Sequence, residues 1–264
     1  MTGSINRDIF EVISNRRSIR KFLNKEIPKD VINKILLAGF RAPFAYQITS
    51  VVYTRDKGKM KQLNKMGIYP TTDLFMVFFF DFNRMERIVK ARNYEYDFDD
   101  SLLLWIGIQD VSLVAENVVL AAEAMGLGSV LLGGAPLMVD TISEVLNVPP
   151  KVFPVVGLCL GYPDPDHLFD IRPRFPLQYT AFEDKYRELS IEELGKCMKS
   201  MDEGYITQGY YIKQNAKIPL SNKEDKIGFD KYSWSEHISR KISQGRWSEE
   251  SLITILRKHG FMLE

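Results

Sequence analysis

Cysteine and histidine are scarce in this sequence, and their placement excludes several kinds of site. The 264 residues contain two cysteines and three histidines. Cys159 and Cys197 have no C-x-x-C spacing and no nearby histidine, which argues against a zinc site and against a disulfide framework. His167, His237 and His259 are scattered, so neither a Ser-His-Asp nor a Cys-His arrangement can be assembled. We therefore predict no metal site and no side chain that carries the catalysis.

An excess of charge of either sign is also missing. The chain has 35 basic and 34 acidic residues, for a formal net charge of +1, so no overall field attracts nucleic acid or an anionic membrane. The first residues include no apolar stretch of signal-peptide length, and no N-x-[ST] glycosylation acceptor occurs. We expect a cytoplasmic protein without a nucleic-acid or membrane partner.

Hydrophobic periodicity predicts interleaved helices and strands, which is the α+β class with a central sheet. The segments expected to be helical are a stripe at Ile5, Ile9, Val12 and Ile13, then 28–41, 138–146, 234–241 and 248–259, the last capped by Ser248. The segments expected to be strands are 50–54, 74–82, 129–132 and 155–160. A polar stretch with few strand signals follows Arg174.

The most apolar segment, residues 102–125, predicts one long helix. Asp110, Glu116 and Glu123 interrupt it, and such charges argue against a membrane span. We expect the helix to be buried on several faces, at a domain centre or a subunit interface. The acidic cluster just before it, Glu95 with residues 97–100, is interpreted as a solvated loop.

Arg16, Ser18 and Arg20 alternate in a segment that we expect to be extended, so their side chains share one face while Arg17 and Ile19 point the other way. Two guanidiniums and a hydroxyl can bind several phosphate oxygens, at roughly 1.5–3 kcal/mol for each shielded, charge-assisted bond. The spacing predicts a small anion site. A solvated basic surface, or a nucleic-acid or targeting patch, would have the same spacing.

A second basic pair, Arg172 and Arg174, flanks Pro173. The proline makes the backbone between the two arginines more rigid. This pair can serve a second anion contact, or it can form surface salt bridges with Asp166 or Asp170.

Gly133 and Gly134 follow the predicted strand 129–132. The segment is not a Rossmann glycine loop, because Leu131 stands where the third glycine would be needed and the first glycines follow a helix. The pair fits a backbone that approaches a flat ligand closely; a plain turn would use the same residues.

Taken in order, the segments resemble the nitroreductase superfamily, in particular its oxygen-insensitive nitroreductases and NADPH-flavin oxidoreductases. The ordered set, which runs from about residue 5 to the C-terminus, carries the resemblance. The matching segments are 15–22 (NRRSIRKF), 81–84 (DFNR), 115–128 (AENVVLAAEAMGLG), 133–134 (GG), 152–163 (VFPVVGLCLGYP), 172–176 (RPRFP) and 234–237 (WSEH).

The resemblance implies a mixed sheet flanked by helices, a long buried helix at a homodimer interface, and a helical C-terminal extension. It implies an FMN-binding core over residues 1–180 and the extension over 181–264, packed on the core or on the partner subunit. FMN would be bound without a covalent bond. The implied FMN-binding residues are Arg16, Arg17, Ser18, Arg20, Pro43, Phe44, Gln47, Gly133, Gly134, Arg172 and Arg174.

Within this set, Arg16, Ser18, Arg172 and Arg174 would hold the phosphate, and Arg20 would stabilise the reduced flavin near its N1/O2 edge. Gly133 and Gly134 would lie against the ring near N5. The chain departs from the family in residues 42–47, which are shorter and more apolar than the usual serine-rich loop. It departs again around Lys213–Lys217, where the family has an arginine-rich loop that selects NADPH.

The expected reaction is ping-pong: NAD(P)H reduces FMN and leaves, and an electron acceptor then enters the same cleft. Because the cofactor performs this chemistry, no catalytic side chain is required. Nitroaromatics, quinones and free flavin are the expected acceptors, since each is flat and electron-poor. The alternatives are a specialised dehalogenating or flavin-remodelling enzyme and a non-enzymatic flavin-binding redox sensor. The preference between NADPH and NADH stays open.

Overall fold

The computed structural model describes residues 8–96, 100–221, 224–244 and 250–263. It contains two compact units. The first comprises residues 1–169 and 248–264, and the second comprises residues 170–247. The C-terminal residues therefore return to the first unit, whereas the division at residue 180 into an FMN-binding core and an extension stays a prediction about function.

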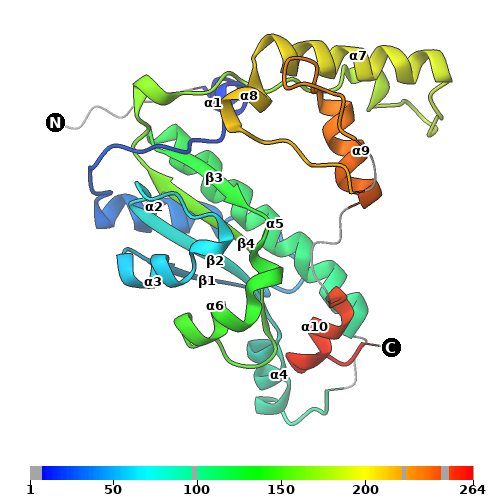
Figure 1. The fold of residues 1–264 in the computed structure, drawn as a ribbon. Helices are drawn as coiled ribbons and strands as arrows, with labels where there is room; N and C mark the ends of the chain where they lie inside the picture. The colour runs from blue at the N-terminus through cyan, green and yellow to red at the C-terminus, as the bar shows by residue number, and fades with distance from the viewer. Residues whose placement is uncertain (1–7, 97–99, 222–223, 245–249, 264) are drawn as a thin grey trace. The chain divides into compact units, whose positions relative to one another are not determined.

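A four-stranded sheet organises the first unit (Figure 1). Its strands are β1 (Thr49–Thr54), β2 (Leu74–Asp81), β3 (Gly128–Leu132) and β4 (Val152–Gly161). Their order is β1-β2-β4-β3, and each neighbouring pair is antiparallel. One parallel bridge, from Ser18 to Ser129, adds the extended N-terminal segment beside β3. The predicted mixed sheet is thus mainly antiparallel, and among the described residues this bridge is its parallel component.

Strand β2 is buried on both faces, because its alternate side chains belong to two different hydrophobic cores. Met76, Phe78 and Phe80 point into one core, whereas Phe75 and Phe79 point into the other. Such a continuous apolar run is typical of a strand covered on both sides. The run ends at Asp81, one residue earlier than predicted, because the Asp81 side chain caps the next helix.

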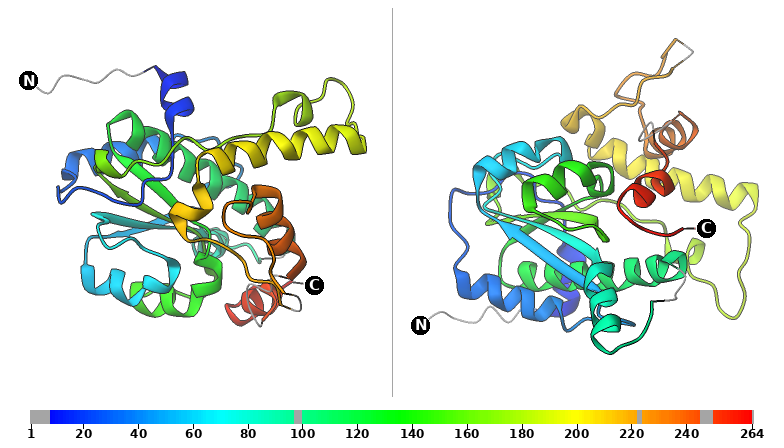
Figure 2. Two further views of the ribbon diagram at one scale, coloured as in Figure 1. Left: turned by 45° about the horizontal axis from the view of Figure 1, so that its top comes forward. Right: turned by 90° about the horizontal axis from the view of Figure 1, so that it is seen from below.

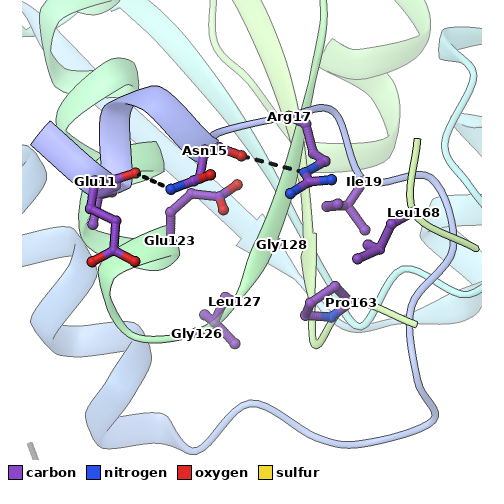
Figure 3. A pocket seen from close by; sticks show the side chains of 11 residues that line it. Glu11, Asn15, Arg17, Ile19, Glu123, Gly126, Leu127, Gly128, Pro163 and Leu168 are labelled. Atoms are coloured by element: carbon purple, nitrogen blue, oxygen red, sulfur yellow. Dashed lines mark hydrogen bonds between the residues drawn. The ribbon is translucent and has the colours of Figure 1, made fainter. Parts of the chain in front are cut away.

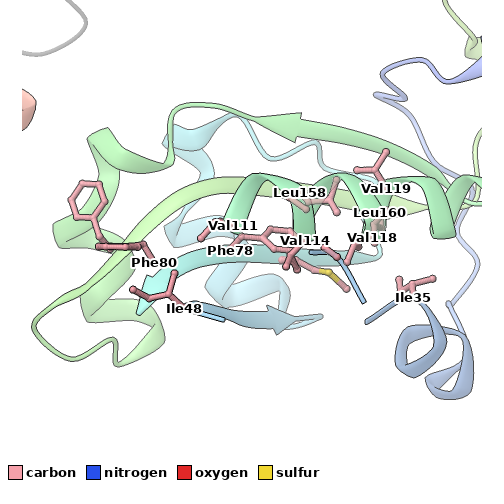
Figure 4. Packing of buried hydrophobic residues seen from close by; sticks show 14 of the residues in the cluster. Ile35, Ile48, Phe78, Phe80, Val111, Val114, Val118, Val119, Leu158 and Leu160 are labelled. Carbon is pink, nitrogen blue, oxygen red and sulfur yellow. The ribbon is translucent and has the colours of Figure 1, made fainter. Parts of the chain in front are cut away.

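Helices cover both faces of the sheet (Figure 2). Helices α2 (Lys29–Gly39) and α5 (Asp100–Ala124) supply one core, and α3 (Lys57–Gln62) and α6 (Val139–Leu146) supply the other. Figure 4 shows Val111, Val114 and Val118 of α5 packed among Phe78 and Leu160. The remaining helices of this unit are α1 (Ile9–Asn15), α4 (Phe82–Ala91) and α10 (Leu252–Lys258), with short 3-10 turns at Asn64–Met66, Ala135–Met138 and Pro165–His167.

Helix α5 confirms the predicted long helix. By length and composition it could cross a membrane, with a mean hydropathy of 1.5, but in the structure it packs on the sheet and on α2. Asp100, at its first turn, corrects the prediction of a solvated loop: it is 1% exposed and accepts hydrogen bonds from the Tyr96 hydroxyl at 2.6 Å and the Met262 amide at 2.7 Å. Residues 97–99 of that cluster lie outside the described part.

Helix α10 (Leu252–Lys258) begins after its N-cap, Ser251, and it places Ile255 and Leu256 in the core of the first unit, which Phe261 of the following segment also joins. The N-cap predicted at Ser248 falls outside the described residues, as does Ile5 of the N-terminal stripe.

The second unit is helical, with α7 (Ile191–Thr207), α8 (Tyr210–Gln214), α9 (Trp234–Gln244) and a 3-10 turn at Leu177–Tyr179. Its small core gathers Met201 and three tyrosines: Tyr205, Tyr211 and Tyr232. Helix α7 was not predicted, although Ser190 and Glu193 form a complete capping box at its start. That local signature of a helix N-terminus was present in the sequence.

Candidate functional site

The predicted anion segment, residues 16–20, is extended and lies along the edge strand β3. The Ile19 amide donates to the Ser129 carbonyl oxygen at 2.8 Å, beside the Ser18–Ser129 bridge. Gly128 permits this close approach, since a Cβ atom there would lie 2.6 Å from the Ile19 side chain. The glycine of the matching segment 115–128 is therefore required by packing.

Arg17 and Ile19 both line a pocket of about 390 Å³, as expected for residues on one face of an extended segment (Figure 3). We call it the N-terminal pocket; its lining is Glu11, Val12, Asn15, Arg17, Ile19, Glu123, Gly126, Leu127, Gly128, Pro163 and Leu168. Arg17 donates to the carbonyl oxygens of Asn15 at 3.4 Å and Phe169 at 3.2 Å. Its guanidinium is thus held beside the pocket by main-chain acceptors.

The side chain of Arg20 has different neighbours from that of Arg17. Its Nε donates to the Tyr69 hydroxyl at 3.0 Å, and its Cζ lies 5.3 Å from the centroid of the Phe169 ring. A hydroxyl acceptor and an aromatic face both stabilise a guanidinium without neutralising it. Sequence reasoning missed Tyr69, because it is 49 residues from Arg20 and its local sequence gives no signal of the contact.

Gly133 and Gly134 directly follow β3, with open space beside their backbone. A Cβ atom built on either glycine meets no described atom within 4 Å, and neither φ is positive. Within this chain, then, neither packing nor a left-handed conformation requires glycine at these positions. The space leaves room for another molecule to approach the backbone.

The segment with Pro43, Phe44 and Gln47 leads into β1, at the opposite edge of the sheet from β3. Two intervening strands separate these edges by roughly 14 Å at the usual strand spacing. Phe44 is 56% exposed, whereas the backbone around it is fixed: the buried Asp110 carboxylate accepts the amides of Ala45 at 2.8 Å and Tyr46 at 3.1 Å.

The segment 81–84 of the resemblance fixes the other end of this loop. Arg84 donates to the carbonyl oxygens of Gln47 at 2.9 Å and Thr49 at 2.8 Å, and to the Ser50 hydroxyl at 2.9 Å. Gln47 itself has a left-handed φ of 51°, which is unusual for a residue other than glycine. The fork of donors on Arg84 thus clamps a strained turn, and this is a structural role that the sequence alone did not reveal.

Arg172 and Arg174 belong to the second unit. The Arg172 guanidinium stacks on the Tyr210 ring, with Cζ 4.4 Å from its centroid, and bonds its hydroxyl. Arg174 donates to the carbonyl oxygens of Arg172 at 3.1 Å and Pro173 at 3.0 Å. Asp170, one of the two expected salt-bridge partners, pairs with Lys213 at 3.4 Å.

One further segment of the resemblance, and one region where the chain departs from the family, hold the second unit together. In 234–237, Ser235 donates its amide and its hydroxyl to Asp202 of α7, at 2.7 and 2.6 Å. In the region of the family's arginine-rich loop, Lys217 pairs with Asp225 at 2.8 Å, and the buried Arg240 joins the same carboxylate at 2.7 Å.

Comparison with known proteins shows the family. The model of the nitroreductase family matches residues 13–68 and 74–162, which together are more than half of the chain. An NADPH-dependent oxidoreductase of Staphylococcus epidermidis is 27% identical over 96% of this chain and 98% of its own length. The NADPH-flavin oxidoreductase of Vibrio harveyi is 29% identical over 88% of this chain and 90% of its own length.

A solved structure, the NADPH:FMN oxidoreductase from Vibrio harveyi complexed with NAD+, matches with a TM-score of 0.77 and 26% identity, covering 96% of this chain and 98% of that one. The chain belongs to the nitroreductase family. The predicted resemblance and fold class are confirmed, and the chain is an oxidoreductase.

Proposed function

We propose that this chain is an FMN-dependent NAD(P)H oxidoreductase that works as a cytoplasmic homodimer. Its relatives support this assignment, since their names specify NADPH, flavin and FMN. The two cysteines are free and buried, in keeping with a reducing compartment.

The observation that carries the proposal is the alignment of two features along β3. The cationic segment 16–20 joins the strand at Ser129, and the open backbone of Gly133 and Gly134 follows its far end. Gly133 lies four positions after Ser129, which is roughly 13 Å along an extended strand. A ligand with a phosphate at one end and a flat ring at the other fits this spacing and donor set, and FMN has that form.

Bound FMN would supply the redox chemistry, taking electrons from NAD(P)H and passing them to an acceptor. The chain would bind and orient it. Arg16 and Ser18 would hold the phosphate, a role that the resemblance also gives to Arg172 and Arg174. Arg20, braced by Tyr69, would present its positive charge to the ring edge where negative charge accumulates on reduction. Gly133 and Gly134 would let the ring lie against the main chain.

Pro43, Phe44 and Gln47 would complete the site from a second copy of the chain. The order of strands supports this arrangement, because these residues lead into the edge opposite to β3. Helix α5 also exposes a stripe of large apolar residues: Leu102 is 49% exposed, Trp105 70% and Leu113 44%. Such a stripe is costly in water and is typical of a subunit interface. Flat, electron-poor acceptors such as nitroaromatics, quinones or free flavin would enter the shared cleft.

The absorption spectrum of the purified protein tests the proposal directly. We expect a yellow protein that releases FMN, not FAD, on denaturation. Under anaerobic conditions NADPH or NADH should bleach the flavin band, and adding a quinone or a nitroaromatic should restore it. A colourless protein that takes up no added FMN would overturn the proposal. Rapid bleaching without turnover of any acceptor would instead indicate a redox sensor.

A further inference from the structure

Glu123 is a half-buried acid behind the anion segment. It is the penultimate residue of α5, and its carboxylate accepts a hydrogen bond from the Ser129 hydroxyl at 2.7 Å. Ser129 is the residue that bridges to Ser18 and accepts the Ile19 amide. Glu123 and Arg17 also line the same N-terminal pocket, as Figure 3 shows. A carboxylate therefore stands next to Arg17, one of the residues in the proposed FMN-binding set.

A negative charge is unfavourable at this position for two reasons. Burial raises the pKa of the Glu123 carboxyl above its usual value, and the Ser129 hydroxyl and the charges of Arg16 and Arg17 act in the opposite direction. The C-terminal end of a long helix also carries a partial negative charge of its own. The carboxylate thus lies in a place where burial and the helix end would favour a neutral side chain, and the charges of Arg16 and Arg17 act in favour of its ionised form.

The carboxylate does not fix the positions of these arginines, so any effect that it has on them is exerted through its charge. Arg17 is held by the carbonyl oxygens of Asn15 and Phe169, and the backbone at Ile19 is held by Ser129. Among the ion pairs of the described residues, none joins Glu123 to Arg16 or Arg17 within 4.0 Å. Removing the charge should therefore change the potential at the segment and leave its geometry in place.

We propose that Glu123 attenuates the anion site: its carboxylate offsets part of the positive charge of Arg16 and Arg17 and so limits how tightly residues 16–20 bind a phosphate monoester. The inference rests on the proposed function, and it assigns to Glu123 a role in setting the affinity for the phosphate of FMN. The expected effect on FMN affinity is unusual in its direction, because loss of the charge of a residue beside the site should strengthen binding.

The test compares Glu123→Gln with the wild type after the flavin has been stripped from both. Glutamine has the same size and can still accept the Ser129 hydroxyl, so only the charge is lost. Glu116→Gln is the matched control, since Glu116 is an exposed acid on the same helix. The dissociation constants of FMN and of riboflavin, which lacks the phosphate, are measured by fluorescence titration at about 0.1 M and about 1 M salt.

We expect Glu123→Gln to bind FMN about three to ten times more tightly at low salt and to bind riboflavin as the wild type does. The gain should shrink at high salt, where charges are screened over about 3 Å, and Glu116→Gln should match the wild type. An unchanged or weakened FMN affinity in Glu123→Gln, or an equal gain in riboflavin affinity or in Glu116→Gln, would overturn the inference alone. A wild type that binds no FMN would overturn the proposed function itself.

Discussion

The carboxylate of Asp110, near the middle of α5, accepts the backbone amide of Ala45 at 2.8 Å from a loop 65 residues earlier in the chain. The same carboxylate takes the Tyr46 amide and is 3% exposed. A carboxylate placed inside an apolar helix thus satisfies two backbone donors of the loop. It connects the helix of the proposed interface to the loop of the proposed FMN site.

Replacing Asp110 by alanine should leave both amides without an acceptor. A hydrogen bond to a charged group contributes about 1.5–3 kcal/mol, so we expect a marked loss of stability in urea unfolding. Faster hydrogen exchange should accompany it at Ala45 and Tyr46. If both amides stay as protected as in the wild type, this carboxylate does not hold the loop.

Arg84→Lys should loosen the turn at Gln47, because a lysine cannot reproduce the planar fork that reaches three oxygens. We expect a lower Tm and a weaker affinity for FMN. Arg87→Lys provides the control, since Arg87 is exposed on the same helix and should tolerate the change. Equal behaviour of the two variants would mean that the clamp contributes nothing.

Trp105→Glu should dissociate the proposed dimer, since it places a charge in the middle of the exposed apolar stripe of α5. Sedimentation should report a monomer at micromolar concentration with reduced FMN content. Ile88→Glu, at a 51% exposed apolar residue of α4, should remain dimeric. A wild type that is already monomeric with flavin bound would contradict the assembly.

Arg20→Ala should lower the midpoint potential of the bound flavin, because the arginine is proposed to stabilise the reduced form more than the oxidised form. A shift on the order of 30 mV corresponds to about 1.4 kcal/mol for a two-electron couple. Tyr69→Phe, which keeps the guanidinium, should shift the potential much less. An unchanged potential in Arg20→Ala at saturating FMN would remove Arg20 from this role.

The Glu123→Gln variant should also be more stable than the wild type at neutral pH. Since burial raises the pKa of Glu123 above 4.5, the folded state is penalised once the group ionises. The contribution of Glu123 to stability is fully present below pH 4.5, and it is lost as the pH rises through the higher pKa that the group has in the folded state. A gain of about 1 kcal/mol would raise the Tm by about 2–4 °C. The difference should vanish near pH 4; a gain that is constant with pH would contradict the assignment.

Much of the fold could be predicted because its signals are local. The apolar spacing of α2, the β-branched run of β1 and the apolar length of α5 each specify one element through a period of 3.6 or 2. The ordered segments at 15–22, 115–128 and 152–163 also indicated the family before any contact was known. Helix α7 was missed although its capping signal and an apolar stripe at Cys197, Met201 and Tyr205 were both there, because the stretch after Arg174 is polar as a whole.

The sequence by itself determined most of the elements and the family, because periodicity and motif order need no knowledge of what lies across the fold. Only the tertiary structure decided which side chains meet. It buried Asp100 against the C-terminal segment, paired Arg20 with Tyr69, and set Glu123 beside Ser129 behind the cationic segment. Such contacts depend on strand order and helix packing. Side chains brought together in this way produce no periodic pattern in the sequence.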